Sequence, residues 1–176
     1  MTQPNLDTSA FLAFANSVNS TSDMYRLFDQ LEELKRLLFK DKEGTIAQKA
    51  GFYMPNNLAP IFADIETRGI EPKGDLGQQR FLDAIADFLK SLPVVSVTLA
   101  FEPTASFIGK LNSEISAIIG EKAVLNLTVN QYISGGAVFE YKGKRREYIL
   151  AEKLEDTIAD LAGQMAKEER AGSSAS

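Results

Sequence analysis

The first 92 residues alternate between short amphipathic stretches and residues that interrupt helices. Within each stretch, apolar side chains recur at three- and four-residue spacing, as one face of a helix requires. The strongest pattern runs from Ser22 to about Lys40, where leucines form a wide apolar stripe and charged residues fill the opposite face. Since each helix has one apolar face to bury, the pattern predicts a bundle of about five short helices. The expected helices span residues 7–18, 22–40, 45–52, 56–67 and 75–92.

Capping residues and prolines set the predicted ends of these helices. Asp75 can accept hydrogen bonds from the free N–H groups at the start of the fifth helix, so it is the expected N-cap. Pro60 is tolerable only in the first turn of the fourth helix, because proline has no amide hydrogen to donate. Pro93 ends the fifth helix, and a different pattern follows it.

Strand patterns dominate the chain after Pro93. Val94–Phe101 is a β-branched run typical of a buried strand, and Ala123–Val129 alternates as a half-buried strand should. The sequence therefore predicts an α+β protein, in which an all-α bundle precedes a small α/β domain of order βαβββα. The expected elements are strands at residues 94–101, 123–129, 137–141 and 146–150 and helices at 105–119 and 152–170.

Three glycines mark the turns of this second part. Gly135 and Gly136 lie between two apolar runs, and Gly143 lies at the tip of the predicted hairpin. Glycine permits positive φ, so all three are expected to be structural turns. A phosphate-binding loop would need further glycines and a Lys-Ser/Thr pair leading into a helix, and the sequence has none there.

The change of pattern also predicts the domain organisation. Residues 1–92 are expected to form the helical bundle and residues 93–170 the small α/β domain. Residues 171–176, AGSSAS, are too small and polar to fold and are expected to be a disordered tail. No internal repeat is visible.

Composition narrows the possible functions. The chain has no cysteine and no histidine, which removes thiol chemistry, the usual proton shuttle and the commonest transition-metal ligand. We therefore expect no catalytic residues, no cofactor and no metal. A net charge of −5 argues against nucleic-acid binding, because a phosphate backbone needs a basic surface. No apolar run approaches the thickness of a bilayer, so a cytosolic protein without membrane insertion is expected.

Several side chains could nevertheless carry chemistry. The aspartates at 29, 83 and 87 fall opposite the apolar stripes and are expected to be surface charges. Phe11 and Phe14 fit core packing and a groove for a partner helix about equally well. The basic residues of the hairpin tip could bind an anion or an acidic helix, but a solvated tip that protects an edge strand is the favoured interpretation. These basic residues are Lys142, Lys144, Arg145 and Arg146.

The order of elements and one motif resemble the delta subunit of F-type ATP synthases, whose mitochondrial relative confers oligomycin sensitivity. The motif is I-x-G-G-A-V-F-x-x-K-G-K-x-x-x-Y-x-L, and the strand and helix before it also fit in order and length. The resemblance covers the whole chain in architecture and the last third in motif. The matching residues are Val129, Asn130, Ile133, Gly135, Gly136, Val138, Gly143, Tyr148 and Leu154.

This resemblance implies a peripheral-stalk, or stator, subunit that catalyses nothing. Such a subunit lies on the cytoplasmic side of the membrane, binds an amino-terminal helix of an alpha subunit through its helical half, and holds the stalk b subunits through its other half. The implied alpha-subunit interface includes Phe11, Phe14, Phe81 and Ile85. The implied stalk interface includes Leu154, Ile158, Leu161 and Met165.

Two alternatives stay open. One is the stalk subunit of a vacuolar or archaeal-type ATPase, although that family begins with one very long helix, which the prolines at 55, 60 and 72 interrupt here. The other is a small ligand-binding or hydrolytic α/β domain with a helical lid. That function would need a pocket with convergent polar groups.

Overall fold

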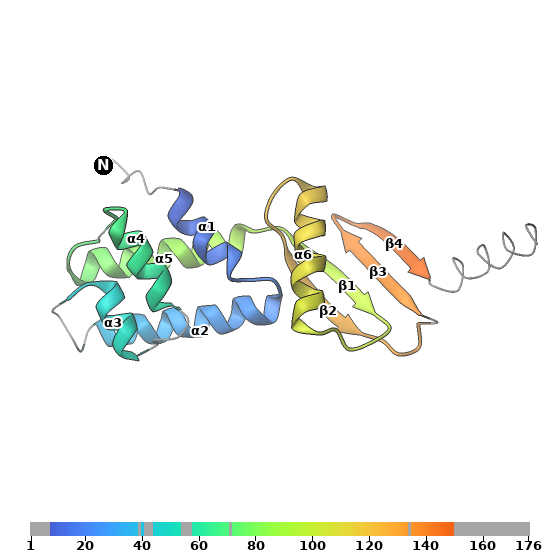
Figure 1. The fold of residues 1–176 in the computed structure, drawn as a ribbon, viewed down its shortest axis with the longest axis horizontal. Helices are drawn as coiled ribbons and strands as arrows, with labels where there is room; N and C mark the ends of the chain where they lie inside the picture. Colours follow the sequence, from blue (N-terminus) through green and yellow to red (C-terminus); the bar gives the residue numbers. More distant parts are fainter. Residues whose placement is uncertain are drawn as a thin grey trace, which may run out of the picture. The chain divides into compact units, whose positions relative to one another are not determined.

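The computed structural model describes residues 8–38, 40, 44–53, 58–70, 72–133 and 135–149 of the 176-residue chain. The described residues hold six helices and a four-stranded mixed sheet, which confirms the predicted α+β class (Figure 1). The predicted helix over residues 152–170 and the tail at 171–176 lie outside the described residues. The elements are α1 (Thr8–Asn16), α2 (Thr21–Leu38), α3 (Ile46–Tyr53), α4 (Ala59–Thr67), α5 (Gly74–Ser91), β1 (Val94–Leu99), α6 (Ala105–Ile119), β2 (Val124–Val129), β3 (Gly136–Tyr141) and β4 (Lys144–Ile149).

Two compact units share these elements. The first contains the described residues up to Val94 together with Ala105–Asn126, and the second contains Val95–Thr104 and the described residues from Leu127 onward. The first crossing of the chain between the units lies close to the boundary predicted near residue 92. Because α6 and the start of β2 belong with α1–α5, the chain passes between the units twice more, after residues 104 and 126.

The start of α2 shows how short-range chemistry sets a helix boundary. The Asp23 backbone N–H donates to the Ser20 hydroxyl oxygen at 3.2 Å, and the Ser20 N–H donates to a carboxylate oxygen of Asp23 at 3.0 Å. This reciprocal pair satisfies N–H groups that the first turn leaves without helical partners. The helix then buries the predicted leucine stripe. Its buried side chains are Met24, Leu27, Leu31, Leu34, Leu37 and Leu38.

Two local predictions have different outcomes. Pro60 lies in the first turn of α4, which confirms the predicted place for a residue without an amide hydrogen. The prediction that Asp75 caps α5 is wrong, because the helix begins at Gly74 and its N-cap is Lys73. Gly74 adopts a φ of 68°, and the N-cap lies two residues earlier than predicted. The Asp75 carboxylate lies in the first turn instead, where a negative charge favours the helix dipole.

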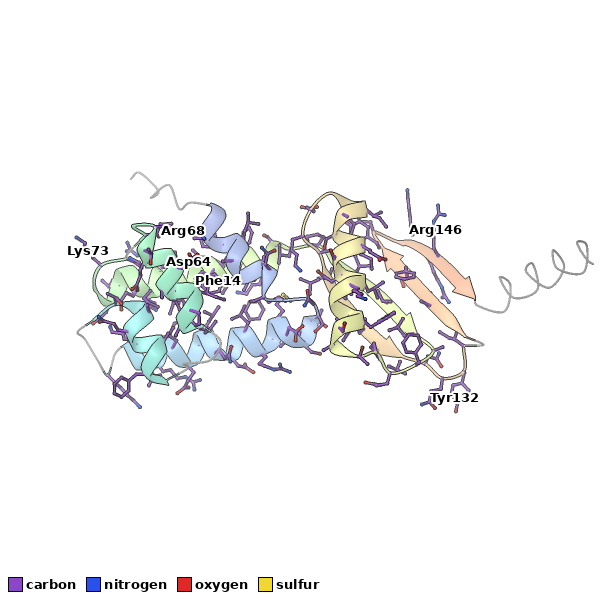
Figure 2. All side chains as sticks on the ribbon, in the orientation of Figure 1. Phe14, Asp64, Arg68, Lys73, Tyr132 and Arg146 are labelled. Carbon is purple, nitrogen blue, oxygen red and sulfur yellow. The ribbon has the colours of Figure 1, made fainter. Side chains whose placement is uncertain are left out.

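Aromatic rings form the centre of the helical unit. Phe14 of α1 is fully buried, and its ring centroid lies 5.2 Å from that of Phe62 in α4 (Figure 2). Phe11 stacks on Phe81 and Phe88 of α5, with centroids 6.2 and 5.3 Å apart. Burying each such ring contributes about 2–3 kcal/mol, so α1 is held mainly by its aromatic residues.

The sheet has the strand order β2-β1-β3-β4. β3 pairs antiparallel with both β1 and β4, and Phe139 lies opposite Val97 on one side and Arg146 on the other. β1 and β2 are joined through α6 and run in the same direction (Figure 1). In β1 the side chains of Val95, Val97 and Leu99 are buried and those between them are half-buried, so this strand alternates although its β-branched run is typical of a strand buried on both faces.

Candidate functional site

The four residues of the expected alpha-subunit interface lie in the core of the helical unit. Phe11 is 9% exposed, and Phe14, Phe81 and Ile85 are more deeply buried. The sequence left core packing and a groove for a partner helix open for Phe11 and Phe14. Their buried positions are those of core residues. Because these four side chains pack inside the helical unit, a docked helix would contact other side chains of α1, α2 and α5.

An exposed aromatic surface lies where α2 and α5 meet. We call Tyr25, Phe28 and Lys90 the aromatic seam. Tyr25 is 64% exposed and its ring meets Phe28 edge to face at 6.5 Å, while Phe28 is half-buried. The Lys90 ammonium lies 5.9 Å from the centroid of the Phe28 ring. Aromatic residues are enriched at protein interfaces.

Ion pairs fix α2 against α5 along this surface. The Lys35 ammonium lies 2.6 Å from the Asp83 carboxylate and 2.5 Å from that of Glu32. Burial opposes the charge of Lys35, but the hydrogen bonds to Asp83 and Glu32 outweigh it and raise the pKa of Lys35. Asp87 is exposed and pairs with Lys90 at 3.3 Å. These aspartates therefore lie at the surface of the helical unit, as their positions opposite the apolar stripe predict.

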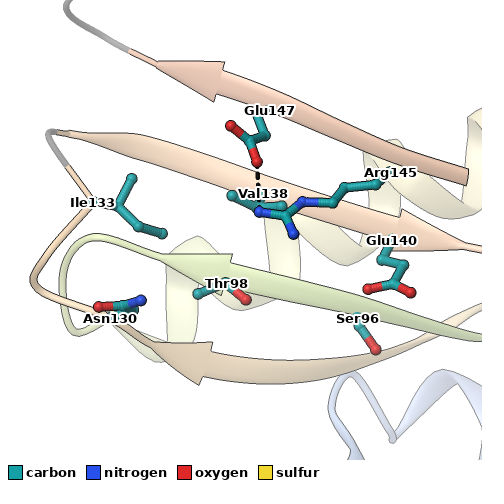
Figure 3. Close-up of a pocket in the computed structure, with 8 residues that line it drawn as sticks. All are labelled: Ser96, Thr98, Asn130, Ile133, Val138, Glu140, Arg145 and Glu147. Carbon is teal, nitrogen blue, oxygen red and sulfur yellow. Dashed lines mark hydrogen bonds and ion pairs between the residues drawn. The ribbon is translucent and has the colours of Figure 1, made fainter.

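Polar side chains line a hollow of about 360 Å³ on one face of the sheet (Figure 3). The hollow contains two carboxylates, those of Glu140 and Glu147, and the Arg145 guanidinium donates to the Glu147 carboxylate. All three charged side chains are exposed, as on the solvated face of an antiparallel sheet. The remaining lining residues are Ser96, Thr98, Asn130, Ile133 and Val138.

The three glycines of the second unit lie at turns with positive φ. The values are 77° for Gly135, 120° for Gly136 and 74° for Gly143. Lys142 also has a positive φ of 49°, so two successive left-handed residues form the β3–β4 turn, as in a tight hairpin of the I′ kind. Arg146 and Lys144 are exposed on β4 (Figure 2), and the hairpin tip is therefore solvated.

Asn112 is a functional candidate that the sequence pattern did not reveal. It is 1% exposed on α6, between positions where the helix presents isoleucine and leucine. Its amide contacts Lys122 and two backbone carbonyls, those of Asn19 and Ala123. The sequence signal that could have identified Asn112 is its place inside an apolar stripe, because a buried amide requires hydrogen-bond partners.

The expected stalk-interface residues Leu154, Ile158, Leu161 and Met165 lie outside the described residues. Within the described ranges, no group of three or more acidic, histidine or cysteine side chains is placed to hold a metal ion. No helix among the described residues is both long and apolar enough to cross a bilayer. The sequence matches no model of a known protein family, and no curated protein matches it.

Proposed function

We propose that this protein is a peripheral-stalk subunit of a rotary F-type ATP synthase, which links the catalytic head to the stalk b subunits and resists the torque of the rotor. One observation carries the proposal. Five helices of the described chain precede a strand, a crossover helix and three further strands, and glycine turns separate the last strands. This is the order that the resemblance implies. The protein would act at the cytoplasmic face of the membrane as a peripheral component.

In this proposal the aromatic seam receives the amino-terminal helix of an alpha subunit. The seam offers Tyr25 as an exposed anchor, with Phe28 as a partly buried floor. An amphipathic helix could cover these rings with its apolar face and place an acidic residue near Lys90. Several modest contacts of this kind suffice for a stator, because each contact after the first is made within one assembly.

The vacuolar or archaeal-type stalk subunit is the weaker alternative. Its long first helix has no counterpart in the described residues, where α1 has 9 residues and α2 has 18. A ligand-binding α/β domain would use the sheet hollow. There Glu147 already pairs with Arg145, and the charged side chains are exposed, whereas catalytic carboxylates are usually shielded from water.

Binding can be tested by size-exclusion chromatography of the protein co-expressed with candidate alpha and b subunits. Co-elution of all three supports the proposal, and separate elution in every combination contradicts it. Tyr25→Ala is expected to weaken binding of the alpha-subunit peptide about tenfold, the usual effect of removing an aromatic anchor. Leu76→Ala is the matched control, because Leu76 is similarly exposed on α5 but lies in its first turn.

A second experiment tests the role in the assembled machine. Deletion of the chain from Ala151 onward removes the expected stalk interface. ATP hydrolysis by the detached head should continue, while ion-driven ATP synthesis in membrane vesicles should fail. Normal synthesis with the truncated protein would contradict the stalk function of this segment. ATP hydrolysis by the purified full-length protein alone would favour the enzyme alternative.

A further inference from the structure

The Asn112 side chain joins three segments of the helical unit that are distant in sequence. Its Nδ2 donates to the backbone carbonyl of Asn19 at 3.0 Å and to that of Ala123 at 2.7 Å. Its Oδ1 accepts a hydrogen bond from the Lys122 ammonium at 2.5 Å. Both hydrogens of the amide and its oxygen are therefore used, so this buried polar group carries no unpaired donor.

The turn between α1 and α2 lies beside the start of β2. The Leu125 N–H donates to the Asn19 carbonyl at 3.0 Å, and Ser20 forms a parallel β-bridge with Leu125. The Asn19 carbonyl thus accepts two hydrogen bonds, one from β2 and one from Asn112. The turn consequently serves as a short neighbouring strand for the beginning of β2, which is an edge strand of the sheet.

Both sides of this contact are held in place. On one side, the reciprocal hydrogen bonds of Ser20 and Asp23 fix the turn. On the other, the Ala123 N–H donates to the Ser116 hydroxyl oxygen of α6 at 3.0 Å. Lys122 connects the two sides, because its ammonium also donates to the Asn19 side-chain oxygen at 3.3 Å. Burial lowers the pKa of Lys122, and the nearby Asp23 carboxylate opposes that effect.

We propose that Asn112 is the positioning residue of a polar clamp, formed by Asn19, Ser20, Asn112, Lys122 and Ala123. The clamp holds α6 and the start of β2 to the helical bundle as one body, and it covers the beginning of the β2 edge so that no other chain can pair there. This inference is independent of the proposed stator function. It assigns the α1–α2 turn, rather than a partner protein, as the neighbour of this strand edge.

Hydrogen exchange of the full-length protein, followed by mass spectrometry, tests the clamp. In Asn112→Ala, peptides covering residues 17–24 and 122–127 should exchange about tenfold faster or more, since two hydrogen bonds to backbone carbonyls are lost. Asn112→Asp should be at least as damaging, because a carboxylate cannot donate to the two carbonyls. Ser113→Ala and Lys110→Met, at exposed positions of α6, should exchange like the wild type.

The outcomes separate the clamp from general destabilisation. Unchanged exchange in Asn112→Ala, or wild-type exchange in Asn112→Asp, would overturn the proposal. If Asn112→Ala does not fold, Lys122→Met decides, because it removes two contacts and leaves the amide donors in place. A rise of about threefold or more that is confined to the same two peptides supports the clamp. No rise, or an equal rise in α3–α4, overturns it.

Discussion

Lys49 and Gln78 form a buried polar pair. Replacing each residue alone should cost, in total, more free energy of unfolding than replacing both together. Lys49 is 3% exposed, and its ammonium donates to the Gln78 side-chain oxygen at 2.9 Å. The Gln78 amide nitrogen donates in turn to the Gly44 carbonyl at 3.1 Å. The nearest carboxylate, that of Asp75, lies 3.9 Å from the ammonium and is partly solvated.

The free energies of unfolding follow from what each substitution leaves behind. Gln78→Leu removes the hydrogen-bond acceptor of a buried ammonium and leaves it only the 3.9 Å ion pair with Asp75, which should cost about 3 kcal/mol. Lys49→Met leaves the Gln78 oxygen without its donor, which should cost about 1–2 kcal/mol. The double variant replaces both partners by apolar groups, so its cost should also be about 1–2 kcal/mol. The sum of the single costs should therefore exceed the double cost by about 3 kcal/mol.

Urea denaturation of the wild type, the two single variants and the double variant measures this difference. Lys110→Met is the control for removal of a lysine charge, because Lys110 is exposed on α6 and should change stability by less than about 0.5 kcal/mol. If the two single costs add to the double cost within about 0.5 kcal/mol, Gln78 does not compensate the buried charge of Lys49.

Three further predictions concern stability. Phe14→Ala should cost about 3–5 kcal/mol, because it opens a cavity against Phe62, and a melting curve like that of the wild type would contradict the core assignment. Gly136→Val should cost about 1–3 kcal/mol, since valine is strained at a φ of 120°; a wild-type midpoint in urea would show that the turn relaxes without cost. As the pH is raised toward 10.5, the free energy of unfolding of the wild type should increase relative to that of Lys122→Met. The native state, with its lowered Lys122 pKa, binds fewer protons there than the unfolded state, and denaturation at several alkaline pH values should reveal a slope.

Local patterns predicted most of the elements because their causes are local. Helix α6 begins and ends where its spacing and Gly120 indicate, and Pro60 lies where its missing amide hydrogen permits. The cap of α5 was mispredicted because a backbone torsion at Gly74, rather than a side-chain hydrogen bond, starts that helix. Capping preferences describe side-chain hydrogen bonds, so they do not predict a backbone torsion of this kind.

The candidate site was less predictable because its contacts are not local. The apolar stripes that contain Phe11 in α1 and Phe81 in α5 showed that one face of each helix must be covered, but a stripe alone cannot distinguish a neighbouring helix from a partner protein. The structure resolves this for their side chains, which stack on each other. Asn112 meets the Asn19 carbonyl across 93 positions of sequence, so no window of the chain contains both groups.

The pairing of Ser20 with Leu125 also constrains how the protein folds as it is synthesised. These residues are 105 positions apart, and the Asn19 carbonyl can accept its two hydrogen bonds only after residues 112 and 125 have been made. At about 5–20 residues per second, the α1–α2 turn waits about 5–20 s for its partners on the ribosome. During that interval the leucines of α2 can already pack, while the turn itself stays open to water. Closing so long a loop is a late step, and a nascent chain interrupted before residue 125 would present a bundle that lacks this side.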